Sequence, residues 1–184
     1  EEEFLERLKE EYQVLCIVNT KKRAQKLYRE LQGEGVYHLS TSMCPRHRKA
    51  VLQKIRQCLE GEKRCVVIAT SLVEAGVDLD FRTVYRQLAG VDSIIQAAGR
   101  CNREGKKSAA ESSVYIFQLD EKEYVPGQRQ QIDVAKMLLG DQKKLDDLQC
   151  IESYFQMLYH IKGDSLDKKH ILEEFRRRDY HFAK

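Results

Sequence analysis

RCVVIATSLVEAGVDLDFRTVYRQLAGVDSIIQAAGRCNREG (residues 64–105) is the stretch that decides the fold. Its apolar run Cys65–Ala69 is too short for a helix and rich in β-branched residues, which is typical of a parallel strand covered on both faces. A loop with Asp78 follows, and residues 83–88 then form a second predicted strand. This pattern indicates an α/β domain with Cys65–Ala69 near the centre of the sheet.

The helix predicted after Asp92, which can cap it, carries a polar face. Gln96, Gly99 and Arg103 are spaced so that they lie on about one face of that helix, with Arg100 one turn beyond Gln96. A glycine inside a helix costs about 1 kcal/mol relative to alanine. Gly99 therefore indicates that another group approaches the helix backbone at this point.

Two further units of strand, turn and helix precede this stretch. Residues 14–18 are an apolar run that ends in Asn19 and Thr20, and residues 36–39 form a second short strand. In parallel α/β sheets, the turns at the carboxyl ends of strands line the crevice where ligands bind. Asn19 and Thr20 can therefore contact a ligand, although Thr20 can equally serve only as a helix cap.

The turn after the second of these strands contains Ser42, and the helix that follows begins with the basic residues 46–49. Cations at the start of a helix oppose its macrodipole, which favours a functional reason such as contact with phosphate. A solvated charged face is the alternative explanation for the same cluster.

The sequence predicts three parts. Residues 1–13 are interpreted as an amphipathic helix or linker. Residues 14–127 are interpreted as the α/β lobe, ending with an apolar strand at residues 113–119. Residues 128–184 are interpreted as a helical appendage, whose apolar residues at helical spacing indicate core packing rather than a cofactor site.

The composition excludes several classes of protein. The chain has 184 residues, a net charge of +3 and 33% charged residues, so any affinity for nucleic acid must come from local placement of charges. No signal peptide and no run of about 18 apolar residues is present, so we expect a cytoplasmic protein without membrane contact. The six cysteines lack C-x-x-C pairs, so we expect free thiols and no metal site. The first residue, Glu1, and the charged end of the chain indicate a piece of a longer protein.

Residues 64–105 carry side chains that suit the handling of phosphates and a nucleotide. An arginine can neutralise the charge that develops on a γ-phosphoryl group, with an effect on the order of 10³ to 10⁵ in rate. Surface salt bridges would explain one such arginine but not the whole set. No G-x-x-x-x-G-K-[ST] loop, acidic box or clustered nuclease histidines are found in the sequence. The stretch therefore reads as half of a nucleotide site. The side chains that suit the handling of phosphates and a nucleotide are those of Thr70, Ser71, Asp78, Gln96, Arg100 and Arg103.

Three segments resemble motifs of superfamily 2 helicases. IVNT (residues 17–20) resembles motif IV, ATSLVEAGVDLD (residues 69–80) resembles motif V, and QAAGRCNREG (residues 96–105) resembles motif VI with its Q-x-x-G-R-x-x-R pattern. HLSTSMCPRHR (residues 38–48) and LAGVDSIIQAAGRCNR (residues 88–103) are similar to the CRISPR-associated helicase-nuclease of type I systems, which degrades invader DNA. The resemblance covers about residues 14–119.

The resemblance implies the second RecA-like lobe of an ATP-driven motor, a three-layer domain of the P-loop NTPase type. It implies that Arg103 is the arginine finger, that Arg100 is its neighbour on the γ-phosphate, and that Gln96 orients the phosphate or the attacking water. Asp78 would contact the ribose of ATP or couple to the finger. Besides the two arginines and Gln96, the residues expected to contact the nucleotide are Asp78, Gly76 and Gly99.

The resemblance also implies partners. Single-stranded DNA is expected to contact Thr70, Ser71, Asn19, Thr20 and Ser42. Mg²⁺ is expected to be bound mainly by an N-terminal RecA-like lobe outside this chain, so the chain alone is predicted to be inactive. A nuclease domain and the type I CRISPR surveillance complex are the other expected partners. The alternatives are a docking module for that complex, or a lobe of another superfamily 2 translocase or RNA helicase.

Overall fold

The computed structural model describes residues 1–74, 77–105, 108, 111–119, 125, 127–140, 145, 147–167 and 170–178, and it divides into two units, Glu1–Ile132 and Asp133–Lys184. The elements of the first unit are α1 (Glu2–Glu10), β1 (Gln13–Ile17), α2 (Lys21–Leu31), β2 (Val36–Leu39), α3 (Pro45–Glu60), β3 (Cys65–Ala69), the 3-10 helix η1 (Ser71–Val73), β4 (Thr83–Gln87), α4 (Val91–Ala98) and β5 (Ser113–Phe117). Those of the second unit are α5 (Arg129–Gly140), whose first turn belongs to the first unit, α6 (Leu148–Lys162), η3 (Gly163–Asp167) and α7 (Ile171–Arg177).

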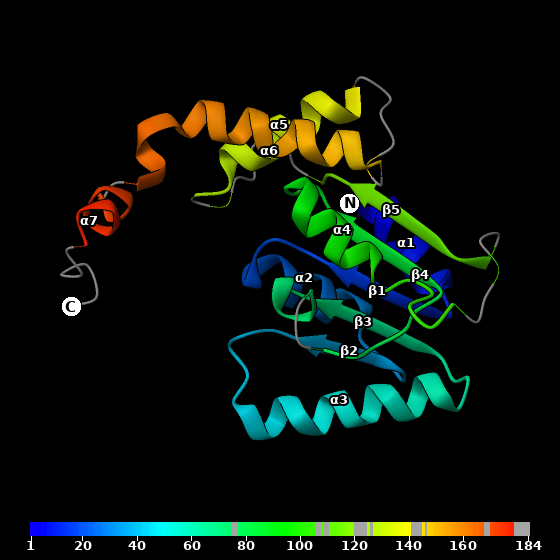
Figure 1. Ribbon diagram of the computed structural model, residues 1–184. Coiled ribbons are helices and arrows are strands. Elements are labelled where there is room, and N and C mark those ends of the chain that lie inside the picture. Colours follow the sequence, from blue (N-terminus) through cyan, green and yellow to red (C-terminus); the bar gives the residue numbers. More distant parts are fainter. Residues whose placement is uncertain are drawn as a thin grey trace. The chain divides into compact units, whose positions relative to one another are not determined.

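The first unit is built on a parallel sheet of five strands in the order β2-β3-β1-β4-β5 (Figure 1). β1 is the central strand, and its Leu15 pairs with Val67 of β3 and Val84 of β4. β3 lies next to it, and all of its residues are buried. The predicted α/β fold with a mostly parallel sheet is therefore confirmed, and the carboxyl ends of all the strands meet at one edge.

Each face of the sheet has its own apolar core, because successive strand residues point to opposite faces. Val14 and Cys16 pack in a cluster that includes Leu8 of α1 and residues of α2. Leu15 and Ile17 pack in a second cluster with residues of α3 and α4. Helices thus cover both faces, which gives the three layers that the resemblance implied.

Gly35, which precedes β2, cannot be replaced without strain. Its φ is +78°, and a Cβ atom on it would lie 2.4 Å from the carbonyl oxygen of Arg64. We expect Gly35→Ala to lower the free energy of unfolding by about 2–3 kcal/mol, because a positive φ and a backbone clash act together. Urea denaturation followed by circular dichroism measures this loss.

Gly105→Ala is the matched control, because Gly105 also has a positive φ, +64°, but nothing lies within 4 Å of the added Cβ atom. We expect a loss of about 1 kcal/mol for this variant. Equal losses for the two variants would show that the contact with Arg64 does not cause the effect.

The helix α4 differs from the prediction at both ends. It begins at Val91 with Gly90 at the N-cap, so the predicted capping by Asp92 is wrong, and Asp92 lies in the first turn instead. It ends at Ala98, with Gly99 as its C-cap at a φ of −64°, which does not require glycine. Gly99 is therefore not inside a helix, and a cost for glycine in the helix interior does not arise.

A pairing with a distant segment draws the chain out of the helix. Phe81 and Cys101 form a parallel β-bridge, and the N–H of Phe81 donates to the carbonyl of Arg100 at 2.9 Å. Because the helix stops before this bridge, the predicted shared helical face of Gln96, Gly99 and Arg103 is wrong.

Most of the described residues after residue 128 are helical, as predicted. Asp147 caps α6, since its carboxylate accepts a hydrogen bond from the N–H of Gln149 at 3.1 Å. Cys150, Tyr154 and Leu158 follow at intervals of one helical turn and are buried. Among the described residues, no helix is both long and apolar enough to cross a membrane.

Candidate functional site

The carboxyl edge of the sheet brings together residues that are far apart in the sequence. Ile17 of β1 and Leu39 of β2 both pair with Ala69 of β3. The N–H of Thr70 donates to the carbonyl of Leu39 at 3.1 Å, which continues the pairing beyond β3. The residues that follow these three strands are those predicted to contact DNA: Asn19, Thr20, Ser42, Thr70 and Ser71.

The hydroxyl groups at this edge differ in their environment. Thr20 Oγ1 accepts a hydrogen bond from the N–H of Arg23 at 3.1 Å, so its capping role is confirmed. The hydroxyls of Thr70 and Ser40 are buried and have no hydrogen-bond partner among the described residues. A buried hydroxyl without a partner is costly, so these two groups are candidates to bind a ligand. Ser42 and Ser71, the two serines that were predicted to contact DNA, are exposed.

Asn19 is held in place by three hydrogen bonds. Its backbone N–H donates to Gln87 Oε1 at 2.8 Å, and its Nδ2 donates to the carbonyl of Leu88 at 2.8 Å. Its Oδ1 accepts from Arg86 Nη1 at 2.6 Å. These bonds set both the position of the backbone and the orientation of the amide, so Asn19 is a fixed group at the sheet edge.

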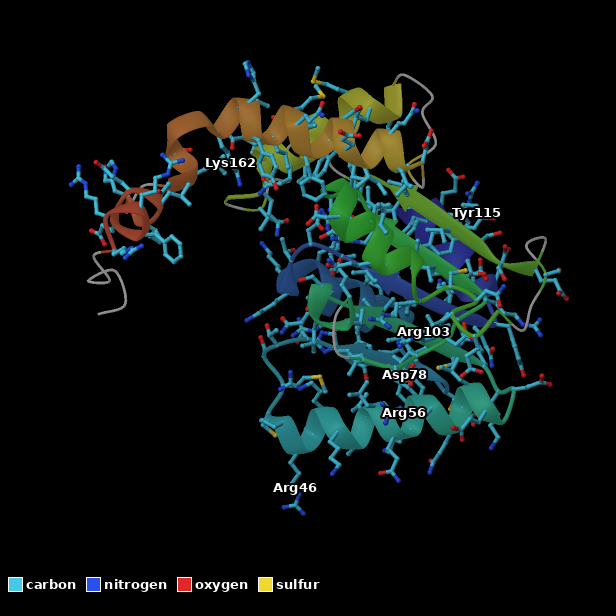
Figure 2. All side chains as sticks on the ribbon, in the orientation of Figure 1. Arg46, Arg56, Asp78, Arg103, Tyr115 and Lys162 are labelled. Atoms are coloured by element: carbon cyan, nitrogen blue, oxygen red, sulfur yellow. The ribbon has the colours of Figure 1, made fainter. Side chains whose placement is uncertain are left out.

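The basic start of α3 is open to solvent. Arg46, His47 and Lys49 are exposed, and Figure 2 shows Arg46 pointing away from the sheet. Pro45 occupies the first turn of the helix, as its lack of an N–H favours. The cluster is therefore accessible to an anion in solution, although it also fits a solvated face.

Arg103 and Asp78 form an ion pair on the surface, with 2.9 Å between Nη1 and Oδ1. Their side chains are 41% and 77% exposed. The N–H of Arg103 donates to Asp80 Oδ1 at 2.8 Å, which orients the backbone. Arg56 Nε lies 3.5 Å from the carbonyl oxygen of Asp78, and Figure 2 shows Asp78 between the two arginines. Since exposed ion pairs contribute only about 0–1 kcal/mol, a phosphate group can draw Arg103 away from Asp78.

Arg100 is engaged more tightly. Its Nε donates to the carbonyl of Val73 at 3.0 Å, and its Nη2 donates to the carbonyl of Glu74 at 2.7 Å. Burial lowers the pKa of Arg100, and the nearby charge of Arg103 acts in the same direction. A guanidinium stays protonated in spite of such a shift. Arg100 therefore joins the end of η1 and its C-cap, Glu74, to the segment after α4.

The other predicted nucleotide contacts are less informative. Gln96 and Gly99 are exposed. A Cβ atom on Gly99 would meet the carbonyl oxygen of Gln96 at 3.4 Å, an ordinary contact, so no close approach within the described structure requires glycine there. Gly76 lies outside the described residues. The described residues contain no group of three or more His, Cys, Asp or Glu that could hold a metal ion.

A buried ion pair, which the sequence analysis did not single out, is bonded to Asn19. Arg86 Nε lies 2.9 Å from Glu74 Oε1, and the two side chains are 2% and 7% exposed. Ser93 Oγ donates to Glu74 Oε2 at 3.2 Å, and Arg86 Nη1 also donates to the carbonyl of Gln87 at 2.7 Å. Burial raises the pKa of Glu74 and lowers that of Arg86, while the attraction between them opposes both shifts.

The sequence held a signal for one member of this pair. Arg86 lies inside the predicted strand at residues 83–88, and a charge that a strand buries needs a partner. Nothing in the sequence identified Glu74 as that partner, because Glu74 lies in a different segment of the chain. Ser40 and Arg56 were also missed, since serines in turns and arginines on helices are common.

The fold defines the class of protein, which is a RecA-like lobe. A parallel sheet lies between two layers of helices, and polar groups follow the carboxyl ends of its strands. The family follows from the sequence: the chain belongs to the family described as CRISPR-associated nuclease/helicase Cas3, C-terminal, whose model matches residues 10–106.

Known proteins agree with this assignment. The CRISPR-associated nuclease/helicase Cas3 of Methanothermobacter thermautotrophicus is 31% identical over 110 residues, which are 58% of this chain and 13% of that protein. The crystal structure of T. fusca Cas3-ATP has a TM-score of 0.63 at 20% identity, covering 96% of this chain and 22% of that one. A chain of a CRISPR RNA-guided surveillance complex in a pre-nicking state has a TM-score of 0.59 at 20% identity, with coverages of 90% and 24%. The structural likenesses show the fold, and the chain spans only a small part of each relative.

Proposed function

We propose that this chain is the C-terminal lobe of an ATP-dependent superfamily 2 DNA helicase or translocase of CRISPR antiviral defence, acting in the cytoplasm. It supplies the arginine finger and part of the track for single-stranded DNA. Membership of the nuclease/helicase family supports this role. The observation that carries it is the exposed, exchangeable ion pair between Arg103 and Asp78.

In this proposal, Arg103 exchanges Asp78 for the γ-phosphate of an ATP molecule that is bound mainly by the N-terminal lobe. ATP supplies the phosphoanhydride bond, and Mg²⁺ is held by that other lobe. Arg100 lies beside the finger, and Gln96 orients the phosphate or the attacking water. Asp78, once released, is free to contact the ribose, and Gly99 lies against the nucleotide.

The carboxyl edge of the sheet holds the phosphates of single-stranded DNA in this proposal. The buried hydroxyl of Thr70 and the fixed amide of Asn19 supply hydrogen-bonding groups there. Thr20, Ser71 and Ser42 extend the same edge. Because this edge and the arginines belong to one lobe, closure of the two lobes on ATP would shift the bound strand.

Thr70→Val tests the track, because valine has the shape of threonine without the hydroxyl. We expect the affinity of the full-length protein for single-stranded DNA to fall about tenfold, as the loss of one hydrogen bond to a charged group predicts. The free energy of unfolding should rise by up to about 1 kcal/mol, since a buried hydroxyl without a partner is removed. Fluorescence anisotropy and urea denaturation measure the two effects, and unchanged DNA affinity would remove Thr70 from the track.

ATP turnover tests the proposed function as a whole. We expect the full-length protein to hydrolyse ATP with stimulation by single-stranded DNA, and the purified 184-residue chain to show no turnover above background. Turnover by the chain alone at a rate typical of intact helicases would contradict the proposal. Stimulation by RNA in place of DNA would favour the RNA helicase alternative.

A second candidate function is docking to the CRISPR surveillance complex. The second unit supports it with large apolar side chains that are exposed: Met137, Leu148, Tyr159, Ile161, Leu166, Ile171, Leu172 and Phe175. If α7 docks, Leu172→Ser with Phe175→Ser should abolish co-purification with the complex and leave ATP turnover unchanged. Unchanged co-purification would reject α7 as the docking element.

A further inference from the structure

A continuous series of contacts joins the carboxyl edge of the sheet to Arg100. Arg86 Nη1 donates to Asn19 Oδ1 at 2.6 Å, and Arg86 Nε lies 2.9 Å from Glu74 Oε1. The carbonyls of Glu74 and of the preceding Val73 then accept hydrogen bonds from Arg100, at 2.7 Å and 3.0 Å. Asn19 and Arg100 are thus connected through only two side chains, those of Arg86 and Glu74.

The ion pair of Arg86 and Glu74 lies in the middle of this series, and separating its two charges is unfavourable. The side chains of Arg86 and Glu74 are 2% and 7% exposed, so water cannot replace either partner. Removing a charge from its partner in a buried place leaves an uncompensated charge. Ser93 donates to the second carboxylate oxygen of Glu74, which holds the carboxylate from the side of α4. Neither Arg86 Nε nor Glu74 Oε1 has a hydrogen-bond partner among the described residues, so burial and the attraction between the two charges hold the pair together.

The two ion pairs of the lobe are built differently. The pair of Arg103 with Asp78 is exposed and is suited to exchange with a phosphate, whereas the pair of Arg86 with Glu74 is buried and is suited to keep its geometry. The exposed pair lies at the proposed ATP side. The buried pair bonds to Asn19 at the proposed DNA side and, through the backbone of Glu74, to Arg100.

We propose that Arg86 and Glu74 are positioning residues that couple single-stranded DNA binding to ATP hydrolysis. A DNA phosphate that shifts Asn19 shifts Arg86, and Glu74 carries the movement to the carbonyls that hold Arg100. The inference rests on the proposed function, which assigns DNA to the sheet edge and ATP to the arginines. It adds the physical connection between the two sites.

The test uses the full-length protein with Arg86→Met combined with Glu74→Leu, because apolar residues of similar volume often replace a buried ion pair without loss of stability. We expect the thermal unfolding temperature and the basal ATP turnover to stay close to those of the wild type. The Kd for single-stranded DNA should rise by no more than about twofold, because Asn19 keeps its hydrogen bonds to Gln87 and Leu88. The stimulation of turnover by saturating DNA should fall about tenfold, within the range of coupling between sites. Lys9→Met combined with Glu6→Leu, at an exposed ion pair of α1, is the matched control and should keep full stimulation.

Each outcome of this test either supports or overturns the inference that Arg86 and Glu74 couple the two sites. If the wild type is stimulated by DNA and the folded double variant is stimulated equally, the coupling inference is wrong while the proposed function stands. If basal turnover and DNA affinity fall in the same proportion as stimulation, the pair is only structural and the inference is also wrong. A wild type without DNA stimulation overturns the proposed function and the inference with it.

Arg86→Lys covers the case in which the double variant does not fold. Lysine keeps the charge opposite Glu74 but lacks the planar fork that reaches Asn19 and Glu74 together. We expect a folded protein whose stimulation by DNA is reduced at least about fivefold, with little change in basal turnover. Full stimulation in this variant would overturn the inference.

Discussion

Arg103→Ala in the full-length protein is expected to lower the kcat of ATP hydrolysis by about a thousandfold. In the proposed function, Arg103 supplies the guanidinium that neutralises charge on the transferred phosphoryl group, and its exposed partner Asp78, a carboxylate, cannot replace it. The Kd for single-stranded DNA should change less than about twofold, because among the described residues the side chain of Arg103 contacts Asp78 and Val77 and none of the groups at the sheet edge. Steady-state turnover at saturating DNA and fluorescence anisotropy measure the two quantities.

Two further variants sharpen this test. Arg103→Lys keeps the charge but not the planar fork, so we expect most of the loss in kcat to persist. Arg29→Ala removes an exposed arginine of α2 and should leave both kcat and Kd unchanged. An equal loss of DNA affinity and of turnover in Arg103→Ala would contradict the division of roles between the two sites.

Arg86→Ala should destabilise the 184-residue chain by about 3–5 kcal/mol, the largest effect on stability that we expect from one substitution. The variant leaves the Glu74 carboxylate buried without its cationic partner, and Asn19 loses one of its hydrogen bonds. Urea denaturation at pH 7, followed by circular dichroism, measures the free energy of unfolding. A loss below about 1 kcal/mol would show that water or another group reaches Glu74.

The loss of stability in Arg86→Ala should depend on pH. Burial already raises the pKa of Glu74 above its ordinary value of 4.5, and Arg86 is the largest influence that opposes this shift. Without Arg86, the pKa in the folded state rises further, so the folded state binds more protons than the unfolded state and stability falls as the pH rises. The destabilisation should therefore shrink as the pH is lowered from 7 towards 5.

Glu74→Gln in the Arg86→Ala background is the control for this pH dependence. The amide carries no charge at any pH, so the double variant should recover part of the lost stability and lose the added pH dependence. The same pH slope in both variants would assign the effect to a group other than Glu74.

The inner strands β1 and β3 were predictable from the sequence because each is buried throughout and reads as a run of mainly apolar residues. β3 is entirely buried and matches the predicted run Cys65–Ala69. The ends of α4 were not predictable in the same way. Asp92 has the side chain of a helix cap, but Gly90 takes that position, and the bridge between Phe81 and Cys101 removes Arg100 from the helix. That bridge joins segments that are separate in the sequence, so local propensity cannot reveal it.

In the candidate site, too, some features were predictable from the sequence and others came only from the structure. The residue types and the resemblance to helicase motifs predicted that Arg103, Arg100 and Asp78 act together, because phosphate chemistry uses guanidinium groups. The partners of these residues came only from the structure, which pairs Arg103 with Asp78 and attaches Arg100 to the carbonyls of Val73 and Glu74. The hydrogen bonds of Asn19 likewise depend on the position of β4 beside β1.

The sequence by itself determined the alternation of strands and helices, and it predicted which residues are able to contact phosphates. These follow from hydrophobic periodicity and from side-chain chemistry, which act over short distances along the chain. Only the tertiary structure decided the strand order and the burial of Arg86 with Glu74. A buried charge is stable only beside its partner, and packing of the strands determines which partner that is.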